Sequence, residues 1–341
     1  MATMDIFNDD AFSAVNMTDA VDKIPYAPSW LGSLGIFTPR PVETTDVAIE
    51  RRSGRLELIP TSERGGPLVE GNPIRRDIRS FRAPRIAKGE TLQAASIQNV
   101  RAFGRESELE QVQAKVAEIN ARTMADMELT WEHMRLGAVQ GVVADADGST
   151  LFDWFDAWGI SPPAEIDFDL DNPSPASGAL KQACNDVIRT MVRAGMGAVT
   201  TTTRIIGLAG DDFYDSFTNH SEVRATYLNQ AEASDLRNNN SPFTTFRFGG
   251  IDWINYRGTD DNSTVAVGTD KVKFFPVGAP GVFQVAYAPG ESFDFVNRPG
   301  RPVYNILVKD QDRNFWVRPE LYSYPLFYCT RPEMLARGKM T

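Results

Sequence analysis

The sequence contains very little cysteine and histidine, and it lacks long apolar runs. Cys184, Cys329, His133 and His220 are the only residues of these two types among 341. Two cysteines predict a reducing compartment and no disulfide framework. Because no run of about 18 apolar residues occurs, we expect no membrane-spanning helix and no membrane partner. The N-terminal sequence is acidic and does not have the basic and apolar regions of a signal peptide.

Sequence motifs that mark enzymes are also missing. His133 has no second histidine four residues away, which excludes a zinc-protease site, and neither a nucleophile elbow nor a P-loop occurs. The glycines at 195–200 lack the third position of a dinucleotide loop. The acidic clusters at 145–148 and 167–171 both fail the calcium-loop pattern. We therefore expect no catalytic residues, no cofactor and no metal. Loss of a measured activity on replacing His133 or His220 would revive an enzyme hypothesis.

The net charge of -10 is unevenly distributed along the chain. Residues 51–105 carry twelve basic and five acidic side chains, a surplus of seven positive charges that leaves -17 for the rest. The acidic total argues against a surface that coats DNA. The basic segment is either a solvated loop or an arm that lies on an acidic partner. Its preference for Arg over Lys favours docking, because the guanidinium fork matches carboxylate geometry.

Two alternating runs within this region predict a β-ribbon. Val47 and Ile49 share one face of the first run, Leu56 and Leu58 share one face of the second, and a Ser-Gly pair at 53–54 lies between the runs. A two-stranded ribbon is only marginally stable in water. We therefore expect this ribbon to need a partner surface.

A long amphipathic helix is predicted over 106–136. Apolar residues recur there at spacings of three and four without internal glycine or proline until Gly137, which corresponds to a length of roughly 45 Å. The opposite face carries seven acidic against three basic side chains. The acidic residues are Glu106, Glu108, Glu110, Glu118, Asp126, Glu128 and Glu132. These charges either solvate an exposed face or provide the acidic partner of the basic ribbon.

The second half of the chain reads as a mixture of helices and strands. A hairpin turning at Asp147-Gly148 is followed by an acidic, proline-bounded connector at 165–175. A helix opens with serines near its N-cap and ends at Gly195. A buried strand at 204–209 and a helix at 211–230 come next. Further strands are expected in 244–258, 270–278, 282–289 and 305–329. The predicted class is α+β.

This order of elements resembles the major capsid proteins of tailed phages, and it is most similar to the lambda-like capsid protein E family. The resemblance extends over nearly the whole chain. The segments that carry it are MDIFNDDAFSAVNMTDAVDKIPYAPSWLGSLGIF, IPTSERGGPLVEGNPIRRDIRSFRAPRI, ESELEQVQAKVAEINARTMADMELTWEHMRLGAVQG, DDFYDSFTNHSEVRAT, APGESFDFVNRPGRPVYN and LYSYPLFYCTRPEML.

The resemblance implies an HK97-like capsid fold with an N-terminal arm, an extended β-ribbon loop, a long spine helix, and peripheral and axial domains. The expected segments are an arm at 1–40, the basic loop at 41–104, the peripheral domain at 105–172, the axial domain at 173–290, and return strands to the peripheral domain at 291–341. The implied function is to form an icosahedral shell of pentamers and hexamers around packaged DNA. An encapsulin-type or other cage-forming shell protein of the same fold is the alternative.

The resemblance also implies partners. We expect a separate scaffolding protein, a portal, a decoration protein and only non-specific contact with packaged DNA, in a virion assembled in a bacterial cytoplasm. Because Lys88 is the loop's one lysine and lies near its base, we expect no covalent crosslinking. In this hypothesis, basic loop residues contact the acidic face of a neighbouring spine helix or acidic residues elsewhere in the neighbour's peripheral domain. The candidate residues are Arg51, Arg52, Arg55, Arg64, Arg75, Arg76, Arg79, Arg82, Arg85, Glu108, Glu110, Glu118, Asp126 and Glu128.

Overall fold

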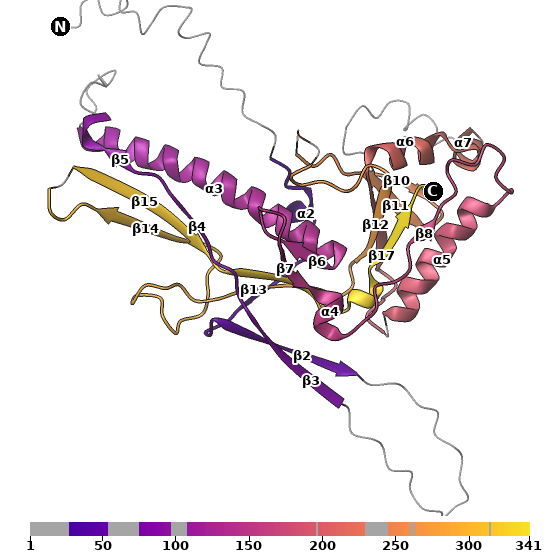
Figure 1. Ribbon diagram of the computed structural model, residues 1–341, viewed down its shortest axis with the longest axis horizontal. Coiled ribbons are helices and arrows are strands. Elements are labelled where there is room, and N and C mark those ends of the chain that lie inside the picture. The colour runs from indigo at the N-terminus through magenta and orange to yellow at the C-terminus, as the bar shows by residue number, and fades with distance from the viewer. Residues whose placement is uncertain are drawn as a thin grey trace, which may run out of the picture.

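The computed structural model describes most of the chain. The described ranges are 27–53, 75–96, 108–195, 197–228, 245–259, 261, 263–313 and 315–341. The long helix α3 (Glu108–Gln140) runs above an elongated sheet on one side of the molecule (Figure 1). A second sheet, flanked by helices, forms the other side, and a two-stranded ribbon projects away from both (Figure 1). This mixture of helices and strands confirms the predicted α+β class.

The helix-flanked sheet has six strands in the order β10-β11-β9-β12-β17-β8. Their bounds are β8 (Ile166–Asp167), β9 (Arg204–Ala209), β10 (Phe246–Phe248), β11 (Ile251–Asn255), β12 (Lys271–Val277) and β17 (Ala336–Lys339). α5 (Ala179–Ala194), α6 (Asp211–Asn219) and α7 (Ser221–Leu228) accompany it. An aromatic core that includes Phe213, Phe217 and Trp253 forms between the sheet and these helices. The sheet therefore includes β8 and β17, which lie in the segments 105–172 and 291–341 that the sequence prediction placed outside the axial domain.

α3 packs on the sheet at the opposite side of the molecule. That sheet has the order β14-β15-β4, and β5 also pairs with β15. The bounds are β4 (Ile86–Gly89), β5 (Leu92–Gln93), β14 (Tyr304–Lys309) and β15 (Trp316–Ser323), with a 3₁₀ turn η3 (Ala94–Ser96) after β5. Met127, Trp131 and Met134 from α3 enter a core shared with Leu321 of β15. The amphipathic face predicted from the sequence therefore packs on this sheet.

A central three-stranded sheet has the order β1-β13-β16. β1 (Thr38–Pro41) runs parallel to β13 (Phe283–Tyr287), and β16 (Pro325–Cys329) runs antiparallel to it. The short helix α2 (Trp30–Ser33) precedes β1, and the 3₁₀ turn η4 (Pro332–Met334) follows β16. Phe37 lies 5.4 Å from Phe283 and 5.3 Å from Phe327, measured between ring centroids. These aromatic contacts hold the segment before β1 against the central sheet.

The hairpin at 142–153 was predicted correctly. β6 (Val142–Ala144) pairs with β7 (Thr150–Asp153), and Gly148 at the turn has φ 83°. The chain then forms α4 (Trp154–Trp158), which Asp153 caps by accepting hydrogen bonds from the backbone N–H groups of Phe155 and Asp156. α4 positions Trp154 and Trp158 in the core beneath the ribbon.

Several helix boundaries differ from the sequence prediction. α3 extends to Gln140, because Gly137 fits within it and the chain turns only at Gly141, where φ is 88°. Gly178, rather than a serine, is the N-cap residue of α5, and no side chain caps that end. The helix expected at 211–230 is divided at His220, whose backbone is extended.

Candidate assembly surface

The ribbon consists of β2 (Asp46–Ser53) and β3 (Arg75–Arg82). The sequence prediction was wrong about the partner strand, because it placed the second strand directly after the Ser-Gly pair at 53–54. The observed register sets Val47 opposite Phe81 and Ile49 opposite Arg79. Residues 54–74 connect the two strands and lie outside the described part of the chain. The partner of β2 therefore begins at Arg75 and not directly after the Ser-Gly pair.

The inner face of the ribbon is buried within its own subunit. Val47 and Ile49 are only 4% and 5% exposed and belong to the core that contains Trp154 and Trp158. The Phe81 ring meets Trp154 edge-on at 5.2 Å between centroids. This part of the ribbon therefore does not need a neighbouring molecule to cover its apolar face, contrary to the expectation from sequence.

The outer face of the ribbon is the side available to a partner. Ile78 is 64% exposed, and Arg82 is exposed at the end of β3. Arg79 instead turns toward its own subunit, where it donates a hydrogen bond to the carbonyl of Ala157 and lies 5.8 Å from the centre of the Trp158 ring. Among the arginines predicted to dock, Arg79 thus already has partners.

Six other predicted contact residues lie on elements that the structure describes. Arg51 and Arg52 lie on β2, whereas Arg75 and Arg76 lie on β3. Glu108 and Glu110 belong to the first turn of α3. Arg55 and Arg64 fall outside the described residues.

Much of the charge on α3 is paired within the subunit. Glu118 lies 2.6 Å from the ammonium of Lys115, and Asp126 lies 2.6 Å from that of Lys88. Arg122 of α3 pairs with Glu90, which follows β4. Glu128 is exposed. Because these pairs face water, each contributes little to subunit stability and can exchange for a partner's charge.

Glu132 departs most from its predicted environment. The sequence pattern placed it on the charged outer face of α3, yet its side chain is fully buried. Its carboxylate accepts hydrogen bonds from the backbone N–H groups of Leu31 at 2.6 Å and Gly32 at 3.0 Å, and from Arg135 at 3.2 Å. Burial raises its pKa despite these donors. Glu132 therefore fastens α2, at the start of the described chain, to the spine helix.

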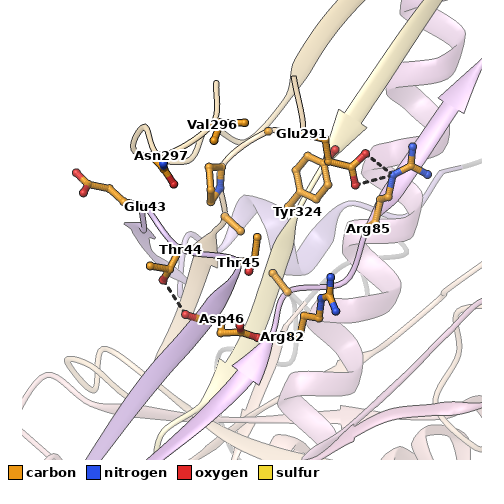
Figure 2. A pocket seen from close by; sticks show the side chains of 14 residues that line it. Glu43, Thr44, Thr45, Asp46, Arg82, Arg85, Glu291, Val296, Asn297 and Tyr324 are labelled. Atoms are coloured by element: carbon orange, nitrogen blue, oxygen red, sulfur yellow. Dashed lines mark hydrogen bonds and ion pairs between the residues drawn. The ribbon is translucent and has the colours of Figure 1, made fainter. Parts of the chain in front are cut away.

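A groove of about 530 Å³ opens at the base of the ribbon (Figure 2). The segment before β2, the end of β3 and the loop at 288–297 line it. Arg85 and Glu291 form an ion pair of 3.0 Å at one side, where Tyr324 also lies (Figure 2). Burial raises the pKa of Tyr324 to about 12, so this phenol stays neutral. The remaining charged lining residues are Glu43, Asp46 and Arg82.

The loop beside this groove exposes apolar side chains. Phe293 is fully exposed at 102%, and Val296, which lines the groove, is 46% exposed. Exposed aromatic and aliphatic groups next to charged side chains are typical of surfaces that bind another protein. The groove, the outer face of the ribbon and this loop form what we call the assembly surface.

The described residues provide little for catalysis. They contain no group of three or more metal-ligating side chains, and none of their helices is both long and apolar enough to cross a membrane. His220 is buried and accepts a hydrogen bond from the Glu222 backbone N–H. Cys184 and Cys329 are free and buried, and burial raises both thiol pKa values to about 12.

Comparison with known proteins identifies the family. The family model described as phage major capsid protein E matches residues 13–340. The chain belongs to the phage major capsid protein E family. It is a major capsid protein of a tailed phage and a component of the virion, which decides against the encapsulin-type alternative. As a capsid protein it has a structural function and is not an enzyme.

Two curated relatives support this assignment. The major capsid protein of Salmonella phage Felix O1 is 25% identical over 95% of this chain and 95% of its own length. That of Pseudomonas phage KPP10 is 24% identical over 96% of this chain and 97% of its own length. Among solved structures, the putative capsid protein of an Escherichia coli CFT073 prophage has a TM-score of 0.49 at 12% identity, covering 95% and 96% of the two chains.

Proposed function

We propose that copies of this capsid protein form an icosahedral shell with an HK97-like fold, in which the ribbon of one subunit crosses onto the next. Residues 1–40 act as the arm, 41–104 as the extended loop and 105–172 as the peripheral domain. Residues 173–290 form the axial domain, which β8 and β17 complete. Residues 291–341 return to the peripheral domain. The order of elements along the chain and the projection of the ribbon support this arrangement.

The observation that carries this proposal is the two-sided character of the ribbon. Its inner face is anchored by Val47 and Ile49, so its direction is fixed by its own subunit. Its outer face presents exposed Ile78 just beyond that anchor and exposed Arg82 at the base of the ribbon, opposite Asp46. A rigid projection with an uncovered outer face is suited to meeting a second copy.

Charge complementarity defines the proposed contact. The outer arginines meet the acidic face of a neighbouring α3, where Glu128 is exposed and where Glu118 and Asp126 are held only by exposed lysines. A surface ion pair is worth about 0 to 1 kcal/mol. Repetition over a closed shell multiplies that small term, and complementary charge selects the register. A scaffolding protein, a portal and a decoration protein would complete the assembly, with packaged DNA contacted non-specifically.

Electron microscopy of the full chain, co-expressed with its neighbouring genes, tests the proposal. We expect closed shells from the wild type and from Arg82→Lys, which keeps the charge. Arg82→Glu should greatly reduce shell yield while leaving the circular dichroism and unfolding midpoint of the subunit unchanged. Normal shells from Arg82→Glu alone, or from Glu128→Arg alone, would contradict the charge pairing, whereas shells restored in the double variant would support it. The absence of any closed assembly from the wild type would contradict the shell itself.

A further inference from the structure

Four cations form a ladder on one face of the six-stranded sheet. β12 contributes Lys271 and Lys273, and β17 contributes Arg337 and Lys339. The antiparallel register places Lys271 directly opposite Lys339 and Lys273 directly opposite Arg337. Side chains directly opposite each other in a sheet lie on the same face, where like charges are destabilising. Such an arrangement requires compensating negative charge.

The charges of the pair Lys271–Lys339, which we call the outer rung of this cation ladder, are compensated by carboxylates. The Lys339 ammonium lies 3.2 Å from the carboxylate of Asp167 on the adjacent strand β8. The Lys271 ammonium lies 3.3 Å from Glu165 and 3.5 Å from Asp270. Three carboxylates therefore surround these two lysines.

The pair Lys273–Arg337, which we call the inner rung, has no carboxylate at ion-pair distance within the described residues. Within the described residues, the Lys273 ammonium makes no hydrogen bond or ion pair, and it is partly buried. Arg337 donates from Nε to the carbonyl of Pro163 at 3.1 Å but has no carboxylate partner there. Burial, together with the charge of Arg337, lowers the pKa of Lys273. Lys273 is thus a partly buried ammonium without a carboxylate at ion-pair distance, and the Arg337 beside it is exposed. Glu165 and Asp270 act on Lys273 only at longer range, so they compensate its charge in part.

Both inner cations line one cavity of about 250 Å³. The cavity lies between the C-terminal end of α3, the start of α4 and the β12–β17 pair, and Gln140 adds a polar side chain. Asp153 is the one acidic residue among its described lining residues, and its Oδ1 already caps α4 at 2.9 Å from the Phe155 nitrogen. Two cations against one engaged carboxylate leave the cavity positive.

We propose that this cavity binds a phosphate group through Lys273 and Arg337, either free phosphate or the phosphate of a nucleic acid. A phosphate carries enough oxygens to accept from the free guanidinium nitrogens of Arg337 and from the Lys273 ammonium together. A single carboxylate has only two oxygens and one negative charge, so it can accept fewer hydrogen bonds from Lys273 and Arg337 than a phosphate can, and it offsets less of their charge. A bound phosphate would offset the positive charge of the inner rung, as the three carboxylates offset that of the outer rung.

Calorimetric titration of inorganic phosphate into the full-length protein, at constant ionic strength maintained with chloride, tests the site. We expect saturable binding by the wild type. Lys273→Met and Arg337→Met should each weaken it about tenfold or more, the effect of removing one charged hydrogen bond. Lys339→Met removes a lysine of the same ladder that is paired with Asp167, and it should retain binding within about twofold.

A second arm distinguishes the source of the phosphate. A short DNA duplex that displaces bound inorganic phosphate from the wild type would identify nucleic acid as a ligand, whereas failure to displace it would indicate the free ion. Absence of saturable phosphate binding, or equal loss of binding in Lys339→Met and Lys273→Met, would overturn the proposal. Because Lys273→Met also removes a repulsion, its melting temperature without phosphate should not fall, which separates lost binding from lost folding.

Discussion

Replacing Glu132 with Gln should loosen the attachment of α2 to the spine helix. The carboxylate accepts from two backbone amides and from Arg135, all within 3.2 Å. In the Gln variant, one oxygen can still accept from Leu31, but the side-chain NH₂ group faces the Gly32 N–H, so a donor opposes a donor. Loss of one charge-assisted hydrogen bond costs about 1.5 to 3 kcal/mol. Because burial raises the pKa of Glu132, neutralising the group relieves a large part of this cost, and we expect a net destabilisation of about 1 kcal/mol.

Glu132→Ala should have a larger effect than Glu132→Gln. It removes every acceptor from a fully buried position and leaves Arg135, only 17% exposed in its side chain, without this partner. Breaking a buried pair in this way costs about 3 to 5 kcal/mol. Urea unfolding of unassembled subunits measures both effects, and limited proteolysis ahead of β1 reports whether α2 is released first. An unfolding midpoint and proteolysis rate for Glu132→Gln equal to those of the wild type would refute the anchoring role.

The pH dependence of this anchor has a definite sign. Burial raises the pKa of Glu132 above its ordinary value of 4.5, so the folded state binds the proton more tightly than the unfolded state. Wild-type stability contributed by this group therefore falls as pH rises from 4.5 through the folded-state pKa. Relative to Glu132→Gln, which lacks this titration, the wild type should gain stability on acidification across that interval. Unfolding curves of both proteins, measured at several pH values between 4 and 8, test this. A difference in unfolding free energy between wild type and Glu132→Gln that stays constant with pH, or that decreases on acidification, would contradict the prediction.

Three other predictions concern single positions. Gly141→Ala would place a Cβ 2.2 Å from the Phe155 ring at a residue whose φ is 88°, so it should lower the free energy of unfolding by about 2 to 4 kcal/mol. Gly148 has φ 83° but lies in open space, so Gly148→Ala should lower it by only about 1 kcal/mol. Urea unfolding midpoints of the two variants test this difference. Cys329, fully buried with a thiol pKa of about 12, should react with iodoacetamide far more slowly in native protein than in urea, and rapid native labelling would contradict its packing. Phe293→Ser should change the melting temperature of the subunit by less than about 1 °C, because the exposed ring contributes no buried area. The same change should reduce the number of shells in electron micrographs, because the loop at 288–297 belongs to the assembly surface.

Local patterns predicted the regular elements well. The 3.6-residue periodicity of α3 was sufficient to find it, and the structure buries Met127 and Met134 from that pattern. The apolar run at 204–209 forms the central strand β9, and its neighbours in the sheet were also recognised as strands. Such signals are reliable because they depend on residues within a few positions of each other.

Pairings between distant segments were not predictable in the same way. Alternation identified Val47 and Ile49 as one face of a strand but gave no information about β3, which begins more than twenty residues later. Glu132 carries the same local signal as Glu128, yet α2, about a hundred residues earlier in the chain, covers only Glu132. Charge placement on a helix therefore does not distinguish a solvated carboxylate from a buried anchor.

The sequence by itself determined most of the helices and strands of this capsid protein, its α+β class and, through extended resemblance, its family. The tertiary structure alone decided which strand completes the ribbon, that the ribbon's inner face is buried in its own subunit, and that Lys273 lies opposite Arg337. The reason is that periodicity records whether a residue faces an interior. Strand register and the identity of the covering element depend on contacts between segments tens to hundreds of residues apart, which no local pattern encodes.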